Sequence, residues 1–239
     1  MRAIGLIGGM SWESTAVYYR HLNERTRQIR GGLASADIIL RSLNFEDIVQ
    51  LQRAGAWDAA ARQLASAAQG LESAGADMVL ICTNTMHKLA DDVASAVSVP
   101  LIHIADVTAE AVLAAGCRRP LLLATRYTME QDFYRDRVRE RHGIEMLVPS
   151  AQDRTAVHDI IFDELCCGII REQSRAIYRA VMARGAEAGA DCVILGCTEI
   201  GLLVGEDDTS LPVFDSTLLH AEAALDYALS PQADGKTIQ

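Results

Sequence analysis

The sequence predicts an α/β protein made of two similar, pseudo-twofold-related domains, each with a mainly parallel sheet flanked by helices. Two observations lead to this fold class. Short apolar runs alternate with helical patterns along all 239 residues, as expected when helices connect parallel strands. One run also occurs twice: residues 76–85 align without a gap with residues 190–199, at an offset of 114 residues (190 − 76). Each copy is a buried strand that ends in small polar residues.

In the first half of the chain, strands and helices are predicted in alternation. Ser11 is expected to cap the first helix, because its hydroxyl can accept a hydrogen bond from the first turn. Gly75 is expected to end the third helix, since glycine readily adopts the conformation that follows a helix. The predicted strands are 2–7, 36–43, the first copy of the repeat and 100–104; the predicted helices begin after Ser11 and span 45–53, 57–74, 86–96 and 106–115.

The same pattern restarts in the second half. The predicted strands are 120–124, 144–148, the second copy of the repeat and 211–214; the predicted helices are 129–141, 153–166, 172–188 and 216–229. We therefore expect a first domain at 1–115, a second domain at 116–214, and a C-terminal helix at 215–239 that returns to the first domain and ends in a frayed tail. Paired domains with apolar helices also favour a homodimer.

Charge and cysteine content limit the class of partner and the compartment. The net charge is −10 and no basic run occurs, which argues against nucleic acid or an anionic membrane as a partner. No apolar stretch approaches the ~20 residues of a membrane helix, and no signal peptide is apparent. Six cysteines without paired CxxC spacing fit a reduced, cytoplasmic protein with no metal site.

Four polar loops follow predicted strands and are the candidate ligand-binding segments: 8–11, 83–85, 125–128 and 197–199. In α/β proteins, ligands bind at the carboxyl ends of the strands. The backbone N–H groups of such loops can hold a carboxylate or another anion. A dinucleotide is disfavoured, because 5–9 does not match the pattern GxGxxG and no GxxxxGK[ST] motif is present.

Cys197 and Thr83 occupy the same position in the two copies of the repeat. Cys197 is either a small core cysteine or a catalytic one; its place in the repeat favours catalysis. A thiol has a reference pKa near ~8.5 that a helix N-terminus lowers, so it can serve as a base. Opposite Cys197, the repeat favours Thr83, whereas acidity favours Cys82. Neighbours on a strand point to opposite faces, so Cys82 and Thr83 cannot both face the substrate. We prefer Thr83, with Cys82 as the alternative.

At these residues the sequence resembles the aspartate/glutamate racemase family. The resemblance covers nearly the whole chain, and its most specific pieces are Cys82-Thr83-Asn84-Thr85-Met86-His87 and Gly196-Cys197-Thr198-Glu199. It is greatest for the bacterial L-aspartate/glutamate-specific and broad-specificity amino-acid racemase branch. The resemblance implies a racemase without pyridoxal phosphate or another cofactor, with an amino-acid substrate bound between two α/β domains.

The resemblance also implies roles for individual residues. One residue removes the α-proton while another delivers a proton to the opposite face of Cα. Cys197 matches the second cysteine of the family and is the expected base for L-substrates. The family's first cysteine falls on Thr83, so this chain departs from the two-cysteine pattern; Thr83 would deliver the proton or position a group that does. The expected substrate contacts are Met10, Gln52, Thr83, Asn84, Thr85, Thr198 and Glu199.

Two alternatives to an aspartate/glutamate racemase remain open. The first is another isomerase or a decarboxylase of the same superfamily, acting on a maleate- or hydantoin-type substrate. The second is a non-catalytic protein that binds an amino acid, and Thr83 in place of a cysteine motivates it. A fold alone does not decide among these functions.

Overall fold

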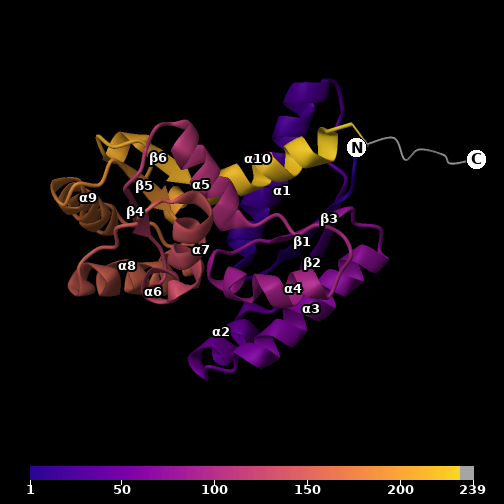
Figure 1. Cartoon of the computed structure of the whole chain (residues 1–239), viewed down its shortest axis with the longest axis horizontal. Coiled ribbons are helices and arrows are strands. Elements are labelled where there is room, and N and C mark those ends of the chain that lie inside the picture. The colour runs from indigo at the N-terminus through magenta and orange to yellow at the C-terminus, as the bar shows by residue number, and fades with distance from the viewer. Residues whose placement is uncertain (232–239) are drawn as a thin grey trace, which may run out of the picture.

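Two three-stranded parallel sheets form the framework of the protein (Figure 1). The structure is a computed structural model that describes residues 1–231; the predicted tail at 230–239 lies mostly outside these residues. The first sheet has the order β2-β1-β3, and the second has the order β4-β5-β6. Their bounds are β1 Ile4–Gly8, β2 Ile38–Ser42, β3 Met78–Ile81, β4 Pro120–Leu123, β5 Cys192–Leu195 and β6 Val213–Asp215. The predicted fold class is confirmed.

Helices cover both faces of the first sheet. Alternate side chains of a strand point to opposite faces, so Leu6 and Leu80 pack on α1 (Trp12–Arg30) and α10 (Ser216–Leu229). On the opposite face, Ile7 and Ile81 pack against α3 (Trp57–Ser73). Ser11 caps α1 and Gly75 follows α3 with a φ of +99°, as predicted. This packing fixes the carboxyl ends of β1 and β3 at one edge.

The second sheet has a single large core. Leu121, Leu123 and Ile194 lie in it, together with side chains from five helices. These helices are α5 (Ile104–Ala114), α6 (Arg126–Glu130), α7 (Asp132–His142), α8 (Ala151–Asp163) and α9 (Glu172–Glu187). The remaining helices are α2 (Phe45–Arg53) and α4 (Ala90–Ser95), with 3₁₀ turns at Thr85–Leu89, Leu165–Cys167, Ile200–Leu202 and Glu206–Asp208.

Two predicted strands are wrong. Residues 100–104 and 144–148 each form only one isolated bridge, Val79 with Leu101 and Leu121 with Leu147. At the first position the cause is local: Pro100 has no N–H to donate, and His103 already caps α5, accepting a hydrogen bond from the Ala105 N–H at 3.2 Å.

Three predicted helices are divided. The helix expected at 153–166 ends at Asp163 as α8, and a separate 3₁₀ turn at Leu165–Cys167 follows it. The helix expected at 86–96 begins as the 3₁₀ turn at Thr85–Leu89 and continues as α4. The helix expected at 129–141 starts earlier, as α6, and is broken before α7 because Gln131 is extended, with φ −88° and ψ 145°.

Helix α10 runs from the end of β6 to α1, against α5 and the first sheet (Figure 1). Its C-terminal turn lies beside the start of the chain, where the Arg2 N–H donates to the Ala228 carbonyl at 3.0 Å. The helix therefore connects β6 of the second sheet with the first sheet. Within residues 1–231, none of the helices has the length and apolar composition of a membrane span.

Candidate active site

The carboxyl ends of the two sheets contribute to one small cavity of ≈ 20 Å³. This volume holds about one water molecule, so an amino acid would enter only if the walls separate. The lining residues come from both halves of the chain: Met10, Phe45, Gln52, Thr83, Asn84, Thr85, Thr125, Ile161, Phe162, Cys166, Gly196, Cys197 and Glu199. A larger hollow of ≈ 640 Å³ between β2 and α3 contains none of the predicted site residues. Chemistry rather than volume therefore identifies the candidate site.

Most of the predicted site residues meet in this cavity, and two do not. Thr198 is not among the lining residues; its hydroxyl donates to Glu199 at 2.8 Å. Cys82 is fully buried in the core between the first sheet and α10, and burial raises the pKa of its thiol. Thr83, the next residue, faces the cavity.

Several lining residues had no sequence motif. Phe45 and Phe162 come from α2 and α8 and stack with their ring centroids 6.5 Å apart and an interplanar angle of 16°. Ile161 and Cys166 lie beside them in the lining. Phe45 is distant in the chain from the other three, which lie in α8 and the 3₁₀ turn after it, so no local pattern distinguishes these residues from core residues. They give the cavity an apolar wall.

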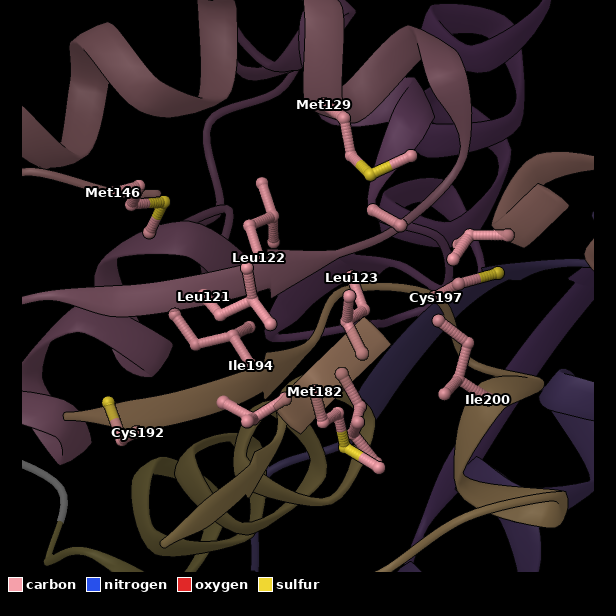
Figure 2. Close-up of a cluster of buried hydrophobic side chains, with 14 of the residues drawn as sticks. Leu121, Leu122, Leu123, Met129, Met146, Met182, Cys192, Ile194, Cys197 and Ile200 are labelled. Atoms are coloured by element: carbon pink, nitrogen blue, oxygen red, sulfur yellow. The ribbon is translucent and has the colours of Figure 1, made fainter. Parts of the chain in front are cut away.

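Cys197 lies just beyond the end of β5, at the edge of the hydrophobic core of the second sheet (Figure 2). Its thiol donates to Glu199 Oε2 at 2.9 Å. The same carboxylate accepts hydrogen bonds from the hydroxyls of Thr198 and Ser11. Glu199 is 2% exposed, and its bond to Ser11 joins the loop after β1 to the loop after β5.

The pKa of the Cys197 thiol is shifted opposite to the sequence-based expectation. A helix N-terminus was expected to lower it, but only the 3₁₀ turn at Ile200–Leu202 follows Cys197. Burial, followed by the nearby carboxylate of Glu199, raises this pKa well above its ordinary value. The resting thiol is therefore protonated, and it needs a proton acceptor before it can act as a base.

Three hydroxyls form a cluster at the cavity, and two of them, those of Thr85 and Thr125, belong to lining residues. Thr85 Oγ1 lies 2.9 Å from Thr125 Oγ1 and 3.1 Å from Thr128 Oγ1. Thr85 follows β3 and the other two threonines follow β4, so this cluster also joins the two halves. Hydroxyls can donate to a carboxylate, which makes the cluster a candidate for the α-carboxylate of a substrate.

Asn84 presents a free acceptor beside these hydroxyls. Its Nδ2 donates to Ser216 Oγ at 3.0 Å, whereas its buried Oδ1 has no partner among the described residues. A buried carbonyl oxygen without a partner is costly, and a substrate ammonium group would satisfy it.

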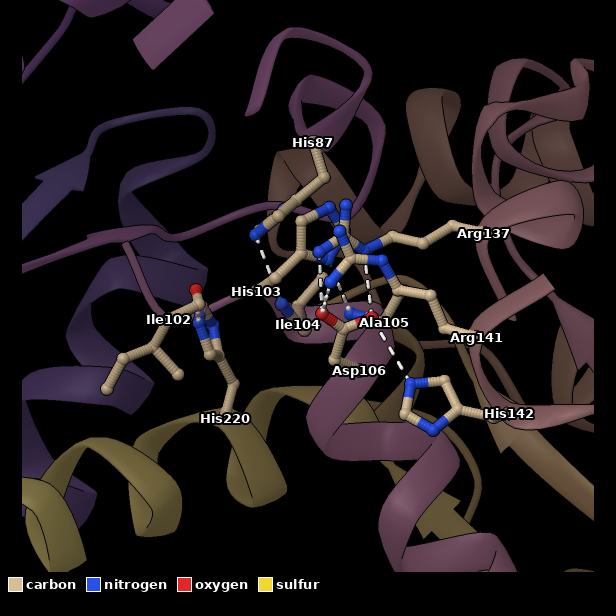
Figure 3. Close-up of polar contacts among 10 residues, drawn as sticks. All are labelled: His87, Ile102, His103, Ile104, Ala105, Asp106, Arg137, Arg141, His142 and His220. Atoms are coloured by element: carbon tan, nitrogen blue, oxygen red, sulfur yellow. Dashed lines mark hydrogen bonds and ion pairs between the residues drawn. The ribbon is translucent and has the colours of Figure 1, made fainter. Parts of the chain in front are cut away.

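Behind the Thr83 loop lies a group of buried histidines (Figure 3). His87 Nδ1 donates to the Thr83 carbonyl at 2.7 Å, and its Nε2 accepts from the Ile104 N–H at 3.2 Å. The rings of His103 and His220 lie 4.6 Å and 5.5 Å from that of His87. These side chains connect the loop to α5 and α10.

A possible metal-ligand group lies elsewhere. Among residues 1–231, the donor atoms of Cys117, Asp191 and Cys192 lie within 4.8 Å of one another. Cys192 begins β5, at the end of the strand away from Cys197 (Figure 2), and Asp191 precedes it. The Asp191 carboxylate accepts from two backbone N–H groups, of Arg118 and Arg119. Asp77, its counterpart in the repeat, binds the Ala3 N–H in the same way, so we assign Asp191 a structural role.

Comparison with known proteins agrees with this architecture. The family model for Asp/Glu/hydantoin racemases matches residues 7–224. A provisionally named Asp/Glu racemase from Yersinia pestis is 53% identical, with a TM-score of 0.90 over 96% of this chain and all of that one. An aspartate racemase homologue from Pyrococcus horikoshii is 36% identical, with a TM-score of 0.84 over the same shares.

A more distant relative has a named activity. The broad specificity amino-acid racemase of Bacillus subtilis is 21% identical over 237 residues, which cover 96% of this chain and all of the relative. These matches confirm the resemblance expected from the sequence. The chain belongs to the Asp/Glu/hydantoin racemase family.

Proposed function

We propose that this protein is a cofactor-independent amino-acid racemase that acts on aspartate or glutamate, or on a broader range of amino acids. The observation that carries the proposal is the presence of Thr83 and Cys197 in one cavity, at the carboxyl ends of strands from two different sheets. Racemisation requires groups on both faces of Cα, and in this proposal the loops after β3 and β5 each supply one of them. The named relatives support the same class of reaction.

In this proposal, two polar groups hold the substrate. The hydroxyls of Thr85 and Thr125 bind the α-carboxylate, while the buried Thr128 hydroxyl is hydrogen-bonded to both of them. Asn84 Oδ1 accepts a hydrogen bond from the α-ammonium group. Met10 and Gln52 contact the side chain of the substrate. Domains at 1–115 and 116–214 then lie on either side of it, with 215–239 returning to the first.

Cys197 is the base for the L-enantiomer. Its own proton passes to Glu199 Oε2, which already accepts the hydrogen bond from the thiol. The sulfur then takes the α-proton, and the electron pair of the Cα–H bond stays on the substrate carbanion. A proton from the Thr83 side, carried by its hydroxyl or by a group that Thr83 positions, completes the D-enantiomer. The reverse reaction uses the same groups in the opposite order.

The direct test is proton NMR of the α-signal in D₂O with a panel of L-amino acids. We expect loss of the aspartate or glutamate signal, and a decrease of about 10²–10⁴-fold in its rate for Cys197→Ala, the usual contribution of a positioned acid or base. Cys167→Ala is the matched control, because Cys167 is an exposed cysteine that does not line the cavity. Wild-type exchange rates in Cys197→Ala would disprove the assigned base.

Turnover of two variants, product mass and thermal stabilisation separate the remaining alternatives. Thr83→Ala should lose turnover while Cys82→Ala keeps it, if both fold; the reverse result would assign the second role to Cys82. Product mass identifies a decarboxylase, since only decarboxylation loses CO₂. Thermal stabilisation by an amino acid without any exchange would indicate a binding protein.

A further inference from the structure

We propose that Ser216 is a positioning residue that determines which atom of the Asn84 amide faces the substrate. Ser216 is fully buried, does not line the cavity, and is the first residue of α10. It receives the hydrogen bond from Asn84 Nδ2, across 132 residues of chain. This inference rests on the proposed function, because it assigns the recognition of the substrate ammonium group.

The direction of the hydrogen bonds fixes the orientation of the amide. The Ser216 hydroxyl donates its single proton to the Leu195 carbonyl at 2.7 Å. Only its lone pairs remain for Asn84, so the Asn84 group that faces Ser216 must be the donor, Nδ2. The other end of the amide, Oδ1, is then directed away from Ser216, and Asn84 lines the cavity.

This orientation matters for binding because it leaves Asn84 Oδ1 available to the substrate. This oxygen is the acceptor that an α-ammonium group needs, and it has no hydrogen-bond partner among the described residues. If the amide rotated by 180°, its NH₂ group would meet the ammonium donor to donor. Ser216 thus favours an amino acid over an analogue without the ammonium group. Its partner Leu195 ends β5, two residues before Cys197, so the same contact connects the binding and proton-transfer loops.

The test compares an amino acid with its 2-hydroxy acid, for example L-aspartate with L-malate, in wild type and Ser216→Ala. A hydroxyl can donate or accept, so the hydroxy acid tolerates either amide orientation. Calorimetry should show that Ser216→Ala binds the amino acid about tenfold more weakly than the wild type does. Its affinity for the hydroxy acid should stay within about twofold of the wild-type value. Thr217→Val is the matched control, because the neighbouring Thr217 hydroxyl is buried and has no hydrogen-bond partner within residues 1–231.

A double-mutant cycle with Asn84→Ala isolates the contact. Once the amide is removed, Ser216→Ala should cause no further loss of discrimination. If Ser216→Ala does not fold, Ser216→Cys replaces the hydroxyl with a weakly bonding thiol at nearly the same volume, and a smaller loss in the same direction is expected.

The possible failures are distinguishable. Equal losses for the two ligands, or an undiminished preference for the amino acid, would overturn the role of Ser216 and leave the racemase proposal intact. A wild-type protein that binds amino acids but exchanges no α-proton would overturn the proposed racemase, while the binding comparison would still report on Ser216. A wild-type protein that binds no amino acid would overturn both.

Discussion

At the scale of single residues, the pairing of Cys197 with Glu199 is the feature that most constrains the chemistry. A carboxylate near a buried thiol opposes formation of the thiolate, and the pKa of Cys197 is raised accordingly. The same carboxylate is hydrogen-bonded to the thiol and can receive its proton. These two effects have opposite consequences for activity, so one substitution separates them.

Glu199→Gln keeps the size of the side chain and removes its charge. If Glu199 accepts the Cys197 proton, we expect kcat for the L-substrate to fall by about 10²-fold or more, even though the pKa of the thiol moves down toward its ordinary value. The pH dependence of Cys197 alkylation by iodoacetamide, located by mass spectrometry, measures the pKa. A variant with a lower thiol pKa and a higher kcat would show that Glu199 only hinders the thiolate.

Equilibrium sets a limit on the Thr83 side. Enantiomers have equal free energy, so the equilibrium constant is one and kcat/KM must be equal in both directions. A threonine opposite a cysteine can make kcat very different for L- and D-substrates, but KM must then differ by the same factor.

At the scale of elements, the buried histidines join the Thr83 loop to α5 and α10. Burial, the largest cause, lowers the pKa of His220 to about 4 and of His103 to about 3; Arg137 and Arg141 add to the shift at His103. The pKa of His87 is lowered for the same reason. All three rings are therefore neutral in the folded protein near pH 7.

Stability should consequently fall as the solution is acidified. The unfolded chain takes up protons at these histidines near pH 6.5, whereas the folded protein takes them up only at lower pH. Below that pH, the free energy of unfolding should fall by up to about 1.4 kcal/mol per pH unit for each histidine. Urea unfolding at pH 8, 7, 6 and 5.5 measures this slope, in a range above the ordinary titration of carboxylates.

A variant tests the origin of the slope. His220→Gln removes one of the histidines that take up a proton on unfolding, so its slope should be smaller by about one histidine's contribution. An equally steep decline in His220→Gln, or a flat profile in the wild type, would contradict this account.

At the scale of the whole molecule, exposed apolar side chains favour self-association. Trp12, Tyr19, Ile29 and Leu33 are 67%, 55%, 52% and 101% exposed, and all lie on α1 or just after it. Large apolar side chains exposed along one helix are candidates for an interaction site. We expect a homodimer through this surface, with twice the chain mass of 25.9 kDa.

Light scattering coupled to size exclusion measures the mass. Tyr19→Glu and Leu33→Glu together should give the mass of a single chain. Ile170→Glu is the control, because Ile170 is also exposed but lies in the second half. A wild-type protein that is monomeric at all concentrations would disprove the dimer.

The sequence predicted the architecture because the relevant signals are local. Apolar runs, glycines after helices and the repeat at an offset of 114 residues each depend on a few neighbouring residues. The repeat also paired Thr83 with Cys197, and strand alternation separated Thr83 from Cys82. The strands at 100–104 and 144–148 were overestimated because an apolar run does not show how many hydrogen bonds a neighbouring strand offers.

Only the tertiary structure decided which distant groups meet and what they do to one another. The stacking of Phe45 on Phe162 and the contact of Ser216 with Asn84 join segments more than 100 residues apart, and no local pattern records such pairs. The pKa of Cys197 also depends on burial and on the nearby Glu199 carboxylate, which act through space. The sequence by itself determined the fold and pointed to the candidate reacting groups, because these follow from short-range patterns. The folded chain determined their protonation and orientation, because electrostatics and hydrogen bonding depend on distance in space.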